Sequence, residues 1–199
     1  MIVRTVSSYV DKRVINQALR ILEDNGIIIY PTDTVYGMGC LINTRKALKR
    51  LYSIKRKRPD KPFSFICHNI KQASQYAIID DRNFKIITDL TPGPYTFVLP
   101  AKKTTPRDLR SQENTVGIRI PANDLILELV KEAQIPLITT SVTIDNFFTS
   151  NCIDDIINYY EYLVDLIIVD EEFQPTQPST ILDLTSEEIK ILREGAGKI

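Results

Sequence analysis

The sequence predicts a single α/β domain, residues 1–199, built around a mixed and twisted β-sheet. Short runs of branched apolar residues, typical of buried strands, are interspersed with segments whose apolar residues recur at helical spacing. Hydrophobic residues make up 43% of the 199 residues, which is enough for one large core, and no repeat, low-complexity segment or linker interrupts the chain. Because strands and helices do not alternate strictly, a mixed sheet is favoured over a purely parallel one.

The first expected element is a helix over residues 9–25. Its apolar residues recur at helical spacing, Asp11 caps its start, and the pair Asn25-Gly26 ends it, with the glycine in the left-handed conformation. Residues 27–30 form a short, wholly apolar run directly after this helix. Such a run predicts a buried strand.

A second helix is expected to begin at Thr44, its cap, and to run to about residue 54, where a basic loop follows. The rest of the chain shows the same two patterns, with Asn123 as a further cap and a rigid Thr-Pro-Gly-Pro turn at residues 91–94. In chain order, these patterns predict a strand over 63–67, a helix over 81–90, strands over 95–100 and 115–120, a helix over 124–133, a strand over 136–141, a helix over 153–160, and strands over 166–169, 179–184 and 189–193.

Charge is distributed unevenly, although the formal net charge is zero. Residues 45–61 contain nine Lys and Arg and one acid, whereas residues 152–172 contain seven acids and no base. Two separate runs of opposite sign give the molecule a field with a direction, which can steer an anionic ligand to one side. We therefore expect the cationic run to hold a phosphate-bearing partner, with a solvated loop as the alternative.

The composition also argues against several kinds of site. A single histidine rules out a His-rich metal site, the lack of a CxxC pair argues against zinc, and neither glycine-rich phosphate-binding signature occurs. Three widely spaced cysteines in apolar stretches predict reduced, mostly buried thiols in a cytoplasmic protein. No apolar run is long enough to span a bilayer and the N-terminus lacks a signal-peptide pattern, so no membrane partner is expected.

Polar residues that could bind a ligand follow the predicted strands. Four such stretches stand out, namely Thr32-Asp33-Thr34, the run 55–58 with Lys61, the hydroxyl-rich run 139–143, and Pro178-Ser179-Thr180 with the more distant Arg193. Ligands of open α/β sheets bind in the crevice outside the strand ends. We therefore expect these stretches to meet in one cleft.

Taken together, these stretches resemble the YrdC/YciO family, which includes the threonylcarbamoyl-AMP synthases. The matching segments follow the family's order over roughly residues 28–197 and read PTDTVYGMGC, IKRKRPDKP, TPGPYTFVLP, TVGIRIPAN, PLITTSVT, PSTILDLT and ILREGAG. The resemblance implies a large twisted mixed sheet with flanking helices that encloses a deep, basic, concave cleft. It also implies an enzyme that combines L-threonine, bicarbonate and ATP, with Mg²⁺, into threonylcarbamoyl-AMP and pyrophosphate for the threonylcarbamoyladenosine modification of tRNA.

The resemblance further assigns roles to individual residues. The catalytic pair that contacts phosphates in the family falls on Lys55 and Lys57. The threonine-binding positions fall on Thr34, Arg119, Ser141 and Ser179. The nucleotide-binding positions fall on Lys57, Lys61, Thr115, Thr143, Asn151 and Arg193. No residue is assigned to a resident metal ion, and a guanidinium fork at Arg119 is well shaped for the carboxylate of an amino acid.

Two positions depart from the family pattern and leave a second function open. Lys57 stands where the family has Arg, and Thr143 stands where it has Asn, so a guanidinium fork and an amide are replaced. In this respect the chain is similar to the YciO branch of the family. The alternative is a protein without synthase activity whose basic cleft binds double-stranded RNA or tRNA through phosphates.

Overall fold

The computed structural model describes residues 1–6, 9–56, 63–144 and 152–198. Within these ranges, one sheet contains ten strands in the spatial order β1 (Ile2–Thr5), β8 (Leu166–Asp170), β2 (Ile28–Tyr30), β3 (Gly37–Leu41), β7 (Leu137–Ser141), β4 (Ser64–Ile66), β6 (Thr115–Arg119), β5 (Tyr95–Pro100), β9 (Thr180–Asp183) and β10 (Lys190–Arg193). Four neighbouring pairs in this part of the chain are parallel and five are antiparallel. The predicted mixed α/β fold is therefore confirmed.

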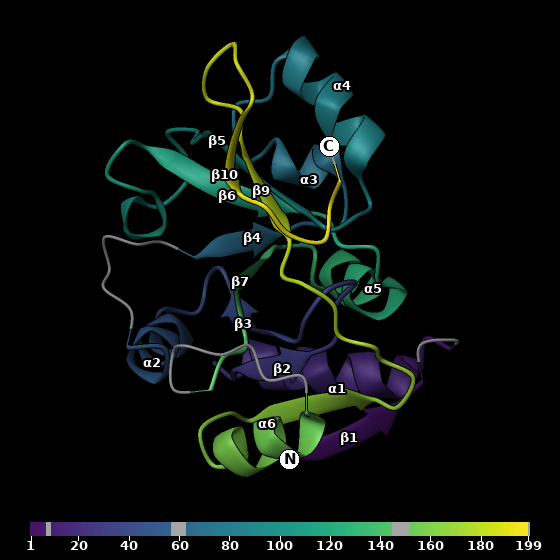
Figure 1. Cartoon of the computed structure of the whole chain (residues 1–199). Helices are drawn as coiled ribbons and strands as arrows, with labels where there is room; N and C mark the ends of the chain where they lie inside the picture. Colours follow the sequence, from purple (N-terminus) through teal and green to yellow (C-terminus); the bar gives the residue numbers. More distant parts are fainter. Residues whose placement is uncertain (7–8, 57–62, 145–151, 199) are drawn as a thin grey trace.

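Helices cover both faces of the sheet (Figure 1). They are α1 (Lys12–Glu23), α2 (Arg45–Ile54), α3 (Ile70–Ala73), α4 (Asp81–Leu90), α5 (Asp124–Ala133) and α6 (Ile153–Tyr160), together with the short 3-10 turn η1 (Arg107–Leu109). The apolar residues of α1 and α5 share one core with the sheet, and those of α2, α3, α4 and α6 share the other. In Figure 1, α1 and α5 lie to the right of the sheet and α2 to the left.

Strand β2 shows how the sequence produces these two cores. Successive side chains of a strand point to opposite faces. Ile29 accordingly joins the core beneath α2, whereas Ile28 and Tyr30 join the core beneath α1 and α5. Both faces of β2 are buried, which explains why its sequence is a continuous apolar run rather than an alternating one.

Most predicted elements are confirmed, several of them with the predicted bounds. Helices α4, α5 and α6 and strand β5 begin and end at the expected residues. Two caps are confirmed as well, because Asp11 accepts a hydrogen bond from the amide of Arg13 and Asn123 accepts one from the amide of Ile126.

Two predictions about helix ends are wrong. The left-handed residue after α1 is Asn25, with φ of 60°, and not Gly26. Gly26 is needed for space, since a Cβ at this position would lie 2.4 Å from the carbonyl oxygen of Ile21. Thr44 precedes α2 as expected, but its side chain does not cap the helix, because the hydroxyl donates instead to the carbonyl oxygen of Leu41.

Strands β1 and β3 and helix α3 were not expected. Residues 37–41, which form β3, include two glycines, and no strand was predicted there. The two glycines lie inside the sheet, where β3 pairs with β2 on one side and with β7 on the other. Low strand propensity is overridden here by pairing on both edges.

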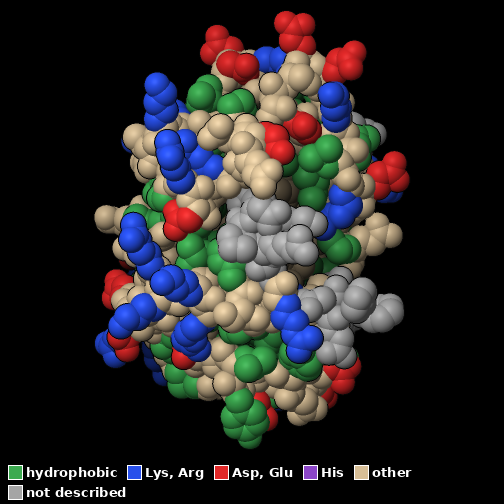
Figure 2. Space-filling view, turned by 90° about the vertical axis from the view of Figure 1, so that its left-hand side faces the viewer, with side chains coloured by type: hydrophobic (Ala, Val, Ile, Leu, Met, Phe, Trp, Pro, Cys, Tyr) green, Lys and Arg blue, Asp and Glu red, His purple; other side chains and the backbone are tan. Residues whose placement is uncertain are grey.

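The two charge runs meet in space and are not held apart. Arg50 of the basic run lies 3.0 Å from the carboxylate of Asp165 in the acidic run. Figure 2, which shows the side of the molecule where α2 lies in Figure 1, has Lys and Arg side chains spread down its left and lower parts, whereas the acids gathered at its top lie at the end away from α6, which belongs to the acidic run. The prediction that the two charge runs form separate electrostatic fields is therefore wrong where Arg50 and Asp165 pair. No helix in the described ranges is both long enough and apolar enough to cross a membrane.

Candidate functional site

A polar cavity of about 240 Å³ opens on the sheet face that carries α1 and α5. Strand β7 shows why it lies where it does. Leu137, Thr139 and Ser141 point to the same face, but only Leu137 lies in the core beneath the helices, while Thr139 and Ser141 line the cavity. On β4, Ile66 likewise lies in the core beneath the helices, whereas Ser64 lines the cavity. The cavity thus occupies the part of this face that α1 and α5 leave uncovered.

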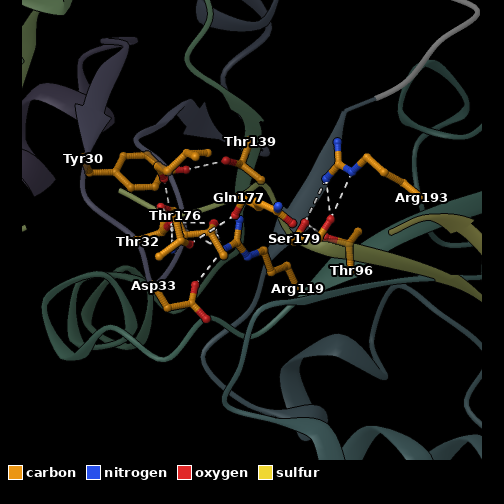
Figure 3. A network of polar contacts seen from close by, with 12 residues as sticks. Tyr30, Thr32, Asp33, Thr96, Arg119, Thr139, Thr176, Gln177, Ser179 and Arg193 are labelled. Atoms are coloured by element: carbon orange, nitrogen blue, oxygen red, sulfur yellow. Dashed lines mark hydrogen bonds and ion pairs between the residues drawn. The ribbon is translucent and has the colours of Figure 1, made fainter. Parts of the chain in front are cut away.

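Arg119, at the end of β6, is the centre of the first polar network in this cavity (Figure 3). Its Nη2 donates to Oδ1 of Asp33 at 2.5 Å, to Oγ1 of Thr34 at 2.7 Å and to Oγ1 of Thr32 at 3.3 Å. The side chains of Arg119 and Asp33 are 8% and 9% exposed. The loop after β2 therefore holds the guanidinium in place with a charge and two hydroxyls.

The second network joins the C-terminal strands to the same cavity. Arg193 donates from Nε and Nη2 to the carbonyl oxygen of Ser179, at 3.0 and 2.7 Å, and from Nη2 to its hydroxyl at 3.1 Å. The Ser179 hydroxyl also lies 2.9 Å from that of Thr96. Burial, and then the positive charge of Arg119, lower the pKa of Arg193 from its ordinary value. Both guanidinium groups thus line one cavity.

Lys55 approaches the cavity from the C-terminal end of α2. Its Nζ lies 2.5 Å from Oγ1 of Thr143 and 3.2 Å from the carbonyl oxygen of Ser141, which lines the cavity. The ammonium group of Lys55 is therefore placed at the end of β7. The hydroxyl of Thr143 serves as its hydrogen-bond acceptor.

A buried tyrosine supports the floor of the cavity. The hydroxyl of Tyr30 lies 2.6 Å from that of Thr139, and Tyr30 is fully buried. Burial raises the pKa of Tyr30 far above its ordinary value, so the phenol stays neutral. Through this hydrogen bond, the buried phenol holds the Thr139 hydroxyl in place at the cavity.

The structure brings together most of the predicted site residues that it describes. Arg119, Ser141, Ser179 and Arg193 line the cavity. Thr34 contacts Arg119, and Lys55 and Thr143 contact each other beside Ser141. Thr115 lies on the same face of β6 as Arg119 but is not among the cavity-lining residues, and its hydroxyl contacts Ser111 instead. Lys57, Lys61 and Asn151 lie outside the described residues.

Three further residues of the site had no assigned role. Thr96 and Ser64 line the cavity, and each is the one Ser or Thr of a mostly apolar strand, which gives no signal in the sequence. Asp33 belongs to a polar stretch that was expected to lie at the site, but its pairing with Arg119 could not be read from the sequence.

The arrangement suits a small ligand that carries a carboxylate or similar anion. Two guanidinium groups supply charge, and the hydroxyls around them can donate or accept. The volume of about 240 Å³ is less than the roughly 300–1,000 Å³ usual for drug-sized ligands. Nowhere in the described ranges do three or more His, Cys, Asp or Glu lie close enough to hold a metal ion.

Fold and site together define an α/β protein with a polar, arginine-lined cavity for a small anionic ligand. Comparison with known proteins then identifies the family. A family model for Sua5, YciO and YrdC, described as telomere recombination, matches residues 20–195. The chain belongs to this family.

Individual relatives are similar over nearly the whole chain. The uncharacterized protein YciO of Escherichia coli is 33% identical over 94% of this chain and 92% of its own length. A putative threonylcarbamoyl-AMP synthase of Methanocaldococcus jannaschii is 32% identical over 92% of this chain and 86% of its own length.

Solved structures agree with this assignment. The crystal structure of E. coli YciO matches with a TM-score of 0.92 and 32% identity, over 100% of this chain and 97% of that one. The crystal structure of Pyrococcus abyssi Sua5 complexed with L-threonine matches with a TM-score of 0.89 and 25% identity, over 98% of this chain and 57% of that one. The family thus includes a protein with a threonine complex and proteins named as synthases.

Proposed function

We propose that this chain is a nucleotide-binding enzyme that forms threonylcarbamoyl-AMP from L-threonine, bicarbonate and ATP, with release of pyrophosphate. The product would supply the threonylcarbamoyl group for tRNA modification in the cytoplasm. The observation that supports this proposal most is that Arg119, Ser141 and Ser179 line one small polar cavity and that Thr34 contacts Arg119 next to it. These four residues come from segments far apart in the chain.

The amino acid is proposed to occupy the Arg119 end of the cavity. A guanidinium binds a carboxylate through charge-assisted hydrogen bonds, and the hydroxyl of Ser179 can pair with the polar groups of threonine, while Thr34 holds Arg119 from behind the cavity. The volume of about 240 Å³ accommodates an amino acid but not a whole nucleotide in addition. ATP would therefore extend from the cavity toward Lys55 and the neighbouring surface.

The chemistry asks for positioning and charge and not for a protein nucleophile. Bicarbonate and the amino group of threonine give a carbamate and water. A carbamate oxygen then attacks the α-phosphorus of ATP, its bond to the bridging oxygen breaks, and pyrophosphate leaves. Lys55 and Lys57 would neutralise the charge that develops on the phosphates, and Mg²⁺ would be bound on the phosphates themselves. Lys61, Thr115, Thr143 and Asn151 would contact the nucleotide, and Arg193, which lines the cavity, would contact it where it meets the amino acid.

The test is product formation by the pure protein. Incubation with ATP, Mg²⁺, L-threonine and ¹⁴C-bicarbonate should give labelled threonylcarbamoyl-AMP on chromatography, and omission of any one substrate should abolish the label. Lys55→Ala should reduce the rate by about a hundredfold, whereas Lys85→Ala on α4 should leave it unchanged. Full folding of the wild type without any labelled product would refute the synthase activity. A salt-sensitive affinity for tRNA that ATP does not alter would then favour the RNA-binding alternative.

A further inference from the structure

Asp33 is the one charged residue of the site that the proposed reaction does not use. Its carboxylate lies against Arg119 at 2.5 Å, and both side chains are more than nine-tenths buried. A buried charge pair of this kind is expensive in free energy, because both ions lose their hydration. Asp33 is not the only residue that holds Arg119, since Thr34 and Thr32 also accept hydrogen bonds from the same nitrogen.

The charge of Asp33 changes what the cavity can bind. Arg119 and Arg193 both line a space of about 240 Å³, and two guanidinium groups on one small cavity favour the binding of a phosphate or sulfate dianion. With Asp33 included, these three side chains have a net charge of +1 rather than +2. This suits the single carboxylate of an amino acid better than a dianion.

Asp33 and Arg119 contact each other through one atom each, Oδ1 of the carboxylate and Nη2 of the guanidinium. Oδ2 of Asp33 and Nε of Arg119 are buried, and neither has a hydrogen-bond partner among the described residues. A fork-to-fork pair would have used both atoms. One acceptor and one donor of the pair are thus left unsatisfied, buried next to the cavity that Arg119 lines. An α-amino acid carries the complementary pair, an ammonium donor and a carboxylate acceptor, whereas a phosphate carries acceptors alone.

We propose that Asp33 is a specificity-determining residue that makes the Arg119 end of the cavity accept an α-amino acid and reject a phosphate group. In the synthase, this selection keeps the triphosphate of ATP out of the amino-acid subsite. The inference rests on the proposed function only in so far as the amino acid binds at Arg119.

The experiment compares the binding of two probes, L-threonine and inorganic phosphate, by titration calorimetry. Asp33→Asn keeps the shape of the side chain and removes its charge. We expect this variant to bind threonine about tenfold more weakly and phosphate about tenfold more tightly than the wild type. Asp33→Glu, which keeps the charge, should retain the preference for threonine. Asp80→Asn makes the same substitution at an exposed helix cap and should change neither affinity.

The outcomes separate this inference from the synthase proposal. A parallel loss of both affinities in Asp33→Asn, or no change in the preference, would show that Asp33 only positions Arg119 and would overturn the inference. A wild type that binds phosphate in preference to threonine would overturn it as well. Selective threonine binding without formation of threonylcarbamoyl-AMP would refute the synthase activity and support the selectivity of Asp33. If Asp33→Asn fails to fold, the Asp33→Glu variant decides, since a loss of the preference there would contradict a role for the charge.

Discussion

The guanidinium of Arg119 is held by oxygen atoms of three consecutive residues, Thr32, Asp33 and Thr34. All three belong to the loop that follows β2, so a single turn of backbone fixes the orientation of the residue proposed to bind the carboxylate of threonine. A lysine at the same place would keep the charge but would lose the planar fork and its several donors.

Arg119→Lys should therefore raise the KM for L-threonine by about tenfold or more, with a smaller change in the KM for ATP. Steady-state pyrophosphate release at varied threonine checks this. Arg107→Lys, in the η1 turn away from the cavity, makes the same change and should behave as the wild type. An unchanged KM for threonine in Arg119→Lys would contradict the assigned role of Arg119.

Thr143 should matter through Lys55, whose ammonium lies 2.5 Å from its hydroxyl. Thr143→Val keeps the shape of the side chain but removes the acceptor, and we expect the KM for ATP to rise by about threefold or more. Thr143→Asn supplies an amide oxygen instead and should keep or improve the affinity for ATP. The matched control is Thr88→Val on the exposed side of α4. Equal ATP kinetics in Thr143→Val and the wild type would argue against a contribution of this contact.

At the scale of elements, the cavity depends on strands whose backbones approach very closely. Gly39 of β3 is paired with β7, and a Cβ at this glycine would lie 2.2 Å from the carbonyl oxygen of Ile138. At Gly117 of β6 the nearest atom to such a Cβ is the side-chain oxygen of Ser64, at 2.7 Å. A substitution of Ser64 can remove the clash at Gly117, whereas no substitution can remove the backbone carbonyl that a side chain at Gly39 would meet.

Gly39→Ala should accordingly lower the free energy of unfolding by about 2–4 kcal/mol, measured by urea denaturation. The comparison is Gly117→Ala, whose loss of stability should be recovered in part when Ser64→Ala is added. If Gly39→Ala were as stable as the wild type, the close pairing of β3 with β7 would be in error.

The sequence was a good guide to elements that depend on local signals. Helices α4, α5 and α6 were predicted with their bounds, because helical spacing and, for α5, the cap Asn123 act within a few residues. Strand β3 was missed, because only pairing with β2 and β7, distant in sequence, makes its glycines part of a sheet. At the site, too, local signals could be read from the sequence and contacts between distant segments could not. Hydroxyls at strand ends signalled a cleft, but the buried pair of Asp33 and Arg119 joins segments 86 residues apart.

At the scale of the whole molecule, two apolar cores on opposite faces of the sheet support the site. Cys40 and Cys67 are buried in the core beneath α2, as predicted for a protein with reduced thiols, whereas Cys152 is exposed. Burial raises the pKa of Cys40 from 9.0 to about 12, and burial raises that of Tyr36 from 10.0 to about 12. Both groups are thus kept neutral by the fold.

These raised pKa values predict a loss of stability in alkali. Below about pH 9 the folded and unfolded chains hold the same protons on Cys40, and its effect on stability is constant. Between pH 9 and 12 the unfolded chain releases the thiol proton first, so the free energy of unfolding falls as the pH rises. Thermal denaturation should show a lower Tm at pH 10.5 than at pH 8, and Cys40→Ala should reduce this difference. An equal pH dependence in Cys40→Ala and the wild type would contradict the role of the thiol.

The central claim is that the cavity around Arg119 is the amino-acid subsite of a synthase. The most direct test is a crystal structure of this protein with L-threonine and a non-hydrolysable ATP analogue. We predict that the threonine carboxylate lies against Arg119 with Ser179 beside the ligand, and that the phosphates lie toward Lys55. Threonine bound elsewhere, or a phosphate group in place of the carboxylate at Arg119, would contradict the claim.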